Sequence, residues 1–235
     1  YLAWLQQQVP VLMKEHHVPG VSIALVRDRK VAFTKAWGVA DAKTGAPVTT
    51  ATLFEVASMS KPVFAYVALK LAEEGKLDLD RPLAEVVAVP SVPGQEELRR
   101  ITPRMVLSHT SGLPNWRKGG EERDGPLPVL FEPGSRFGYS GEAMYQLQRV
   151  VEKVTGEPLE EYAKEALFAP LGMESSSFVW TSRLDAALAT GHEEDGKPRA
   201  RARYRHANAA YSLVATAPDY ARFLAAILDP GSFGP

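Results

Sequence analysis

An almost entirely apolar stretch in the first third of the chain restricts its possible folds more than any other feature. Residues 63–72 are apolar except for one tyrosine and one lysine, and a helix that is hydrophobic on all sides is normally buried. Pro62 is tolerated only in a first helical turn, because proline lacks an N–H and its ring clashes with the carbonyl four residues earlier. Gly75 suits a left-handed cap at the other end. The sequence therefore predicts a buried central helix that begins near Ser58 to Ser60.

Ser58 and Lys61 lie at the predicted start of this helix, three residues apart, so that their side chains share one face. A serine hydroxyl becomes a strong nucleophile when a neighbouring base takes its proton, and a lysine can be that base where desolvation or nearby positive charge lowers its pKa. The N-terminus of a buried helix adds positive dipole ends that stabilise developing negative charge. A Ser-x-x-Lys pair also occurs by chance in roughly every second chain of this size, so the pair alone leaves a structural role open.

The composition excludes several classes of function. The 235 residues are 45% hydrophobic and 23% charged with a net charge of −1, which gives no general attraction to nucleic acid or to an anionic membrane. The absence of cysteine excludes disulfides, thiolate catalysis and cysteine-ligated metals. No apolar run has transmembrane length, and residues 1–18 read as an amphipathic helix rather than a signal peptide. We expect neither a nucleic-acid partner nor stable membrane insertion, and the compartment and the oligomeric state stay open.

Strands and short helices are predicted on both sides of the central helix. Residues 21–27 and 31–37 read as a β-hairpin, and residues 38–54 as a loop. Later helices are predicted at 103–107, around 144–154, at 159–168 and after the capping pair Thr216 and Asp219. Two strands alone leave open edges, and 209–215 is the only later candidate. We therefore expect either further strands or a sheet completed beyond Pro235.

Tyr139 is the third candidate for chemistry. It stands in the segment FGYSG, after the turn at Pro133-Gly134 and before a predicted helix. A tyrosine in such a turn can present its hydroxyl to a substrate, and a nearby cationic lysine favours the phenolate, which can relay protons. The alternative is a partly buried core tyrosine with a satisfied hydroxyl.

Several ordered segments resemble the serine β-lactamase-like hydrolases, which include class C β-lactamases, D-alanyl-D-alanine carboxypeptidases and esterases of the same fold. The segments are TLFEVASMSK at 52–61, LSHTSGLP at 107–114 and FEPGSRFGYS at 131–140, with further similarity at 170–173 and 216–224. The resemblance implies an α+β fold with an antiparallel sheet flanked by helices and a mostly helical lobe. We assign residues 1–76 and 206–235 to the α/β lobe and residues 77–205 to the helical lobe.

The resemblance also implies roles for three residues. Ser58 would be the nucleophile, Lys61 its proton acceptor and Tyr139 the proton-relaying tyrosine, with no cofactor. Whether Lys61 or Tyr139 acts as the base in acylation is left open. The resemblance alone suggests a periplasmic or extracellular protein, and a cytoplasmic one is possible, so the compartment is left open.

The chain departs from the family pattern in two places. Members that act on β-lactams or D-alanyl peptides usually carry asparagine two positions after the tyrosine, where this chain has Gly141. Glycine cannot hold the lysine or a substrate amide, which favours esters. The third motif of the family, a strand that donates one N–H to the oxyanion hole, is not found before Pro235. Losing one such donor typically costs about 10²–10³-fold in turnover, so a weakened enzyme or a fragment is expected if nothing replaces it.

The sequence thus predicts a serine hydrolase that forms an acyl-enzyme. Its substrate would be a small molecule or peptide, with a carboxyl ester preferred over a D-alanyl peptide or a β-lactam. The alternative is a non-catalytic binding or regulatory protein, or an inactive fragment, that retains the fold. The complete set of Ser58, Lys61 and Tyr139 argues against that alternative, because a binding protein needs none of their chemistry.

Other residues with possible chemistry are better explained by structural roles. The resemblance makes His109 a structural residue of its loop, and the remaining histidines lack the spacing of metal ligands, so no metal is expected. The basic residues of 197–205 follow three acidic ones, which favours a solvated loop over an anion or nucleic-acid site. Trp116 either borders the site or packs within its loop.

Overall fold

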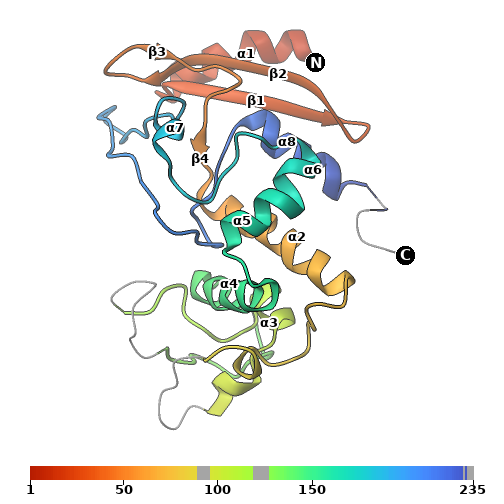
Figure 1. Ribbon diagram of the computed structural model, residues 1–235. Helices are drawn as coiled ribbons and strands as arrows, with labels where there is room; N and C mark the ends of the chain where they lie inside the picture. The colour runs from red at the N-terminus through yellow and green to blue at the C-terminus, as the bar shows by residue number, and fades with distance from the viewer. Residues whose placement is uncertain (89–95, 119–126, 230, 232–235) are drawn as a thin grey trace. The chain divides into compact units, whose positions relative to one another are not determined.

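The computed structural model describes residues 1–88, 96–118, 127–229 and 231, which form two compact units (Figure 1). Unit 1 contains Tyr1–Val56, Leu167–His206 and the described residues from Leu213 on, whereas unit 2 contains Ala57–Ala166 and Ala207–Ser212. The lobes expected from the sequence have other boundaries. They stay a prediction, because a compact unit is not necessarily a domain that folds by itself.

Unit 1 is built on an antiparallel hairpin. Strand β1 (Gly20–Arg27) pairs with β2 (Lys30–Asp41), and β2 also pairs with β3 (Ala46–Pro47), in the order β1-β2-β3. The predicted hairpin is confirmed, but β2 continues beyond Trp37 into the segment that we expected to be a loop. Gly38, with φ at +76°, resembles a turn residue in the sequence and here lies inside the strand, where only glycine adopts this angle easily.

Helices and a small second sheet complete the described part of unit 1. Helix α8 (Ala217–Ile227) packs on β1 and β2 (Figure 1), and α1 (Leu2–Glu15) buries Leu5 and Val9. The strands β4 (Phe54–Glu55) and β5 (Val214–Ala215) pair antiparallel, so only the end of the predicted strand 209–215 is a strand. A core cluster lies beside them, formed by Leu53, Leu184, Leu188 and Val214. The short helices α6 (Ala169–Leu171) and α7 (Ser182–Asp185) lie in the same unit.

The start of α8 shows half of the predicted capping box. The Thr216 hydroxyl accepts the N–H of Asp219 at 3.1 Å, as expected for an N-cap. The Asp219 carboxylate accepts the N–H of Ser175 at 3.0 Å and the hydroxyl of Ser176 at 3.1 Å. Asp219 therefore links the loop at Ser175 and Ser176 to the first turn of α8.

Unit 2 is organised around the predicted buried helix. Helix α2 (Ser60–Glu73) follows a 3₁₀ turn, η1 (Ala57–Met59). Val63, Phe64 and Leu71 are fully buried, and Gly75 has φ at +69° just after the helix. The predicted environment and both predicted ends are thus confirmed.

Further helices follow α2 in the chain, and the last of them ends in unit 1. Their bounds are η2 (Leu83–Glu85), η3 (Glu96–Arg100), α3 (Pro103–Leu107), α4 (Gly141–Thr155) and α5 (Leu159–Ala163), which continues as the π-helical turn η4 (Lys164–Phe168). The α3 N-cap is Thr102, as predicted, and α4 ends at Gly156 with φ at +78°. Helices with antiparallel strands confirm the α+β class. None of the helices in the described part of the chain is both long and apolar enough to span a bilayer.

Candidate active site

The backbone before α2 presents Ser58 outward. Ala57 has φ at +46°, in a left-handed region that residues with a Cβ rarely adopt. The Ser60 hydroxyl donates to the Ala57 carbonyl at 2.6 Å, which holds this turn. As a result Ser58 is exposed, whereas Ser60 and Lys61 are buried. The hydroxyl of Ser58 is therefore accessible to a substrate.

Lys61 is placed against Ser58 inside unit 2. Its Nζ lies 3.1 Å from Ser58 Oγ and donates to the Ala210 carbonyl at 2.8 Å. The side chain is almost fully buried, with 5% of its residue surface exposed, so the amine is held in one position. A separation of 3.1 Å is within the range for direct proton transfer between the two groups.

Tyr139 joins the same cluster. Lys61 Nζ lies 4.7 Å from the centroid of its ring, and its hydroxyl interacts with both Ser58 and Lys61. Burial alone would raise the pKa of Tyr139, but hydrogen bonds to Lys61 and Ser58, with the charge of Lys61, lower it below the usual value of 10.0. The structure thus brings all three predicted residues together.

His109 holds the segment that carries Tyr139. Its carbonyl accepts the N–H of Gly138 at 2.7 Å, and its Nδ1 accepts the N–H of Ser140 at 3.2 Å. The imidazole lies 4.6 Å from the Tyr139 ring, centroid to centroid. Burial first, and then the charge of Lys61, lower the pKa of His109. The imidazole is therefore neutral near pH 7, with its proton on Nε2.

The role of His109 could not be read from the sequence alone. We expected a structural residue of the loop, and the contact with Tyr139 adds a specific function to that placement. The sign of this role is structural, because the φ of His109 is +55°, a region in which residues other than glycine are uncommon.

Trp116 lies over the start of α4. A Cβ added to Gly141 would lie 2.5 Å from Cζ2 and Cη2 of the indole. The indole thus fills the space next to Gly141, the position where an asparagine was expected from the family pattern. The indole also meets the Tyr211 ring edge to face, with the centroids 5.6 Å apart.

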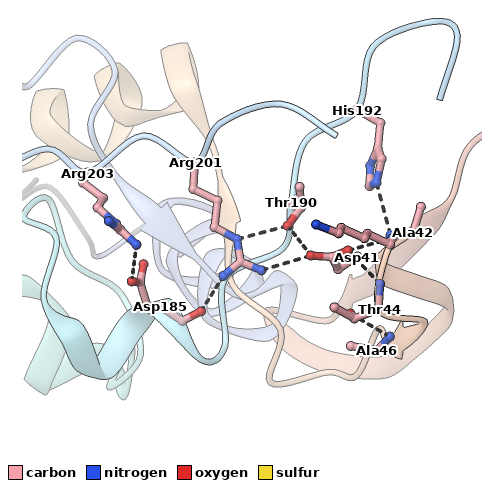
Figure 2. A network of polar contacts seen from close by, with 10 residues as sticks. Asp41, Ala42, Thr44, Ala46, Asp185, Thr190, His192, Arg201 and Arg203 are labelled. Atoms are coloured by element: carbon pink, nitrogen blue, oxygen red, sulfur yellow. Dashed lines mark hydrogen bonds and ion pairs between the residues drawn. The ribbon is translucent and has the colours of Figure 1, made fainter. Parts of the chain in front are cut away.

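Four basic residues of 197–205 are paired within unit 1, namely Lys197, Arg199, Arg201 and Arg203, and Figure 2 shows the last two. Arg201 donates to Thr190 Oγ1 at 3.0 Å and to the Asp185 carbonyl at 2.8 Å, and Arg203 pairs with the Asp185 carboxylate at 2.8 Å. Lys197 and Arg199 pair with Asp195 and Glu193 at 2.6 and 3.1 Å. This pairing supports the interpretation as a loop and argues against a basic binding patch.

The described residues contain no group of three or more histidine, aspartate and glutamate side chains arranged to hold a metal ion. His192 instead accepts the N–H of Ala42 at 3.3 Å (Figure 2).

Comparison with known proteins finds relatives of this chain. The family model "Beta-lactamase" matches residues 5–234. Esterase EstB of Burkholderia gladioli is 32% identical over 194 residues, which cover 71% of this chain and 49% of the esterase. A putative D-alanyl-D-alanine carboxypeptidase of Escherichia coli O157:H7 is 31% identical over 205 residues, 74% of this chain and 45% of the relative. The chain thus spans about half the length of these relatives.

The fold is likewise found among solved structures. The octameric penicillin-binding protein homologue from Pyrococcus abyssi superimposes with a TM-score of 0.82 at 26% identity, covering 99% of this chain and 58% of that one. The family model and the identity to both relatives lead to one conclusion: this chain belongs to the β-lactamase family, the serine β-lactamase-like hydrolases.

Proposed function

We propose that this protein hydrolyses carboxyl esters through an acyl-enzyme formed on Ser58. The observation that carries the proposal is the distance of 3.1 Å between the exposed Ser58 hydroxyl and the buried amine of Lys61. An exposed nucleophile beside a fixed base is the arrangement that covalent catalysis by serine requires.

The reaction would run in two halves. Ser58 Oγ attacks the carbonyl carbon while its proton passes to Lys61 or Tyr139, and the ester C–O bond then breaks as the alcohol leaves with that proton. Water next attacks the acyl carbon and gives its proton to the same base. The acid is released as the proton returns to Ser58 Oγ. The backbone N–H of Ser58 would be one of the donors to the oxyanion.

Tyr139 and Lys61 suit different parts of the proton transfer. The lowered pKa of Tyr139 increases the phenolate fraction near neutral pH, which favours a relay between Ser58 and the leaving group. The hydrogen bond from Lys61 to the Ala210 carbonyl fixes the amine in place at 2.8 Å. Both groups therefore remain candidates for the base of acylation.

Gly141 and one of the relatives favour an ester as the substrate. Gly141 offers no side-chain amide to bind a substrate amide, and EstB is named an esterase. A D-alanyl peptide is the second candidate, because another relative of similar identity is named a putative D-alanyl-D-alanine carboxypeptidase.

Labelling with a fluorophosphonate, followed by peptide mass spectrometry, tests the nucleophile. We expect the wild-type protein to form one adduct on Ser58 and to hydrolyse p-nitrophenyl butyrate. Both the adduct and the hydrolysis should be lost in Ser58→Ala. A folded protein that takes no label and hydrolyses neither this ester nor a D-alanyl-D-alanine peptide nor a chromogenic cephalosporin would contradict the proposal. That result would favour a non-catalytic binding protein.

A further inference from the structure

We propose that Trp116 determines substrate specificity. Its indole, which fills the space beside Gly141, would form an apolar wall against the acyl group of the ester. This inference rests on the proposed ester hydrolysis and specifies its substrate class as esters of apolar carboxylic acids.

Gly141 is required for space and not for backbone conformation. It is the first residue of α4 and does not have a positive φ, so any residue could adopt its backbone angles. A Cβ at this position would nevertheless lie 2.5 Å from two atoms of the Trp116 ring, closer than non-bonded carbon atoms approach. The indole thus takes the volume that a side chain at 141 would use.

The segment around Trp116 is fastened to the first turn of α4 by hydrogen bonds. Asn115 Oδ1 accepts the N–H of Gly141 at 2.9 Å, and its carbonyl accepts the N–H of Glu142 at 2.8 Å. The Ser140 hydroxyl, which also caps the helix, donates to the Pro114 carbonyl at 2.7 Å. The residues before Trp116 therefore cannot move independently of α4.

An ion pair holds Arg117, the residue that follows Trp116. Arg117 pairs with Glu142, and their side chains are 3% and 0% exposed. A buried pair of this kind is costly to separate. Both neighbours of Trp116 are thus bound to the first turn of α4.

Two short segments connect the Trp116 indole with the reactive cluster, which consists of Ser58, Lys61 and Tyr139. In the first, Gly141 comes two positions after Tyr139, a span of at most about 7 Å. In the second, Lys61 donates to the carbonyl of Ala210, and Tyr211, one position after Ala210, contacts the indole. These links support a place for the indole beside the reactive cluster.

The chemistry of this wall selects for apolar acyl groups. Trp116 is half-buried, so part of its ring remains accessible. An indole offers one N–H donor and no acceptor for a substrate N–H, and an amide group packed against it would lose a hydrogen bond to water without replacement. Aliphatic or aromatic acyl groups instead gain from apolar contact with the ring.

Two p-nitrophenyl esters with the same leaving group test this specificity. We expect the wild-type protein to prefer the octanoate over the acetate in kcat/KM, and Trp116→Ala to lower the value for the octanoate by about 10-fold. The value for the acetate should change by less than about 3-fold. Trp4→Ala is the matched control, because Trp4 lies on α1 and is 54% exposed, and it should leave both values unchanged.

The outcomes separate this inference from the proposed function. Equal losses for both esters in Trp116→Ala would show that the indole only supports the fold, and would overturn the specificity role while leaving ester hydrolysis in place. Wild-type protein that hydrolyses neither ester and takes no label on Ser58 would overturn the proposed function, and with it the substrate class.

Thermal unfolding tests the packing without any substrate. Gly141→Ala should lower Tm by about 3 °C or more, because its methyl group collides with the indole. In a Trp116→Ala background the same change should have little further effect, a non-additivity expected of residues in contact. An equal loss of Tm in both backgrounds, or none in either, would overturn the claim that the indole fills this space.

Discussion

His109 and Tyr139 are joined through their rings and through the backbone. The ring centroids lie 4.6 Å apart at an interplanar angle of 31°, and the N–H groups on both sides of Tyr139 donate to His109, one to its carbonyl and one to its Nδ1. No hydrogen bond found among the described residues joins His109 to Ser58 or to Lys61. We therefore regard it as a positioning residue for the tyrosine.

Replacing His109 should slow acylation. His109→Ala loses the ring contact and the acceptor for the Ser140 N–H, and we expect the rate of labelling by a fluorophosphonate to fall about 10- to 100-fold, as for other small misplacements of reacting groups. His109→Asn tolerates the positive φ and can still accept a hydrogen bond, so it should lose less. If both variants are labelled at the wild-type rate, His109 has no part in placing Tyr139.

Ionisation of Tyr139 should cause the acylation rate to increase with pH on the acidic side of the pH–rate profile. Because its pKa is lowered from 10.0, the phenolate fraction grows as the pH rises, so the acylation rate should rise with pH and the midpoint of this rise should lie below pH 10. Stopped-flow acylation of the wild-type protein and of Tyr139→Phe measures this. Persistence of the same rising limb in Tyr139→Phe would exclude Tyr139 as the titrating base.

Breaking the buried pair of Arg117 and Glu142 should strongly destabilise the folded state. Arg117→Met leaves a carboxylate that is 0% exposed without its cation, which we expect to lower the free energy of unfolding by about 3–5 kcal/mol. Adding Glu142→Gln should recover part of this loss, since the amide is neutral and keeps an acceptor for Gln146, which donates to Glu142 at 2.9 Å.

Urea denaturation of the three forms checks this prediction. Arg100→Met is the exposed control, because Arg100 and Glu132 form an ion pair with side chains 60% and 53% exposed, and it should cost about 0–1 kcal/mol. A double variant that is less stable than Arg117→Met alone would refute the interpretation.

Asp41 should make unit 1 sensitive to acid. Hydrogen bonds from the N–H groups of Thr44 and Lys43, and then from Thr190, lower the pKa of Asp41 (Figure 2). A lowered carboxyl pKa stabilises the folded state above the unfolded pKa, near 4, and this stabilisation is lost as the pH falls through the folded value. Asp41→Asn should therefore be less stable at pH 7 and lose less further stability on acidification.

Thermal unfolding between pH 7 and pH 3 measures this effect. Asp28→Asn is a suitable control, because the Asp28 side chain is 88% exposed and its replacement should change neither Tm nor its pH dependence. If the Tm of Asp41→Asn depends on pH as the wild-type Tm does, other carboxylates cause the acid sensitivity.

Features set by neighbouring residues could be predicted from the sequence. Pro62 and Gly75 indicate the two ends of α2 because each restricts its own backbone angles or hydrogen bonds. The strand-forming residues of 21–27 and 31–37, with the turn at 28–30 between them, indicate a hairpin for the same reason. The strands β3 and β4 were missed, because two residues are too short to show an alternating pattern.

The sequence by itself determined the buried helix, its start, and the proximity of Ser58 to Lys61, because a spacing of three positions brings two side chains together in a helical or 3₁₀ turn. Only the tertiary structure decided that Ala210 anchors Lys61, that His109 holds Tyr139 and that Trp116 fills the space beside Gly141. Each of these pairs is far apart in the chain. Their contact follows from the packing of whole segments, which local propensity does not encode.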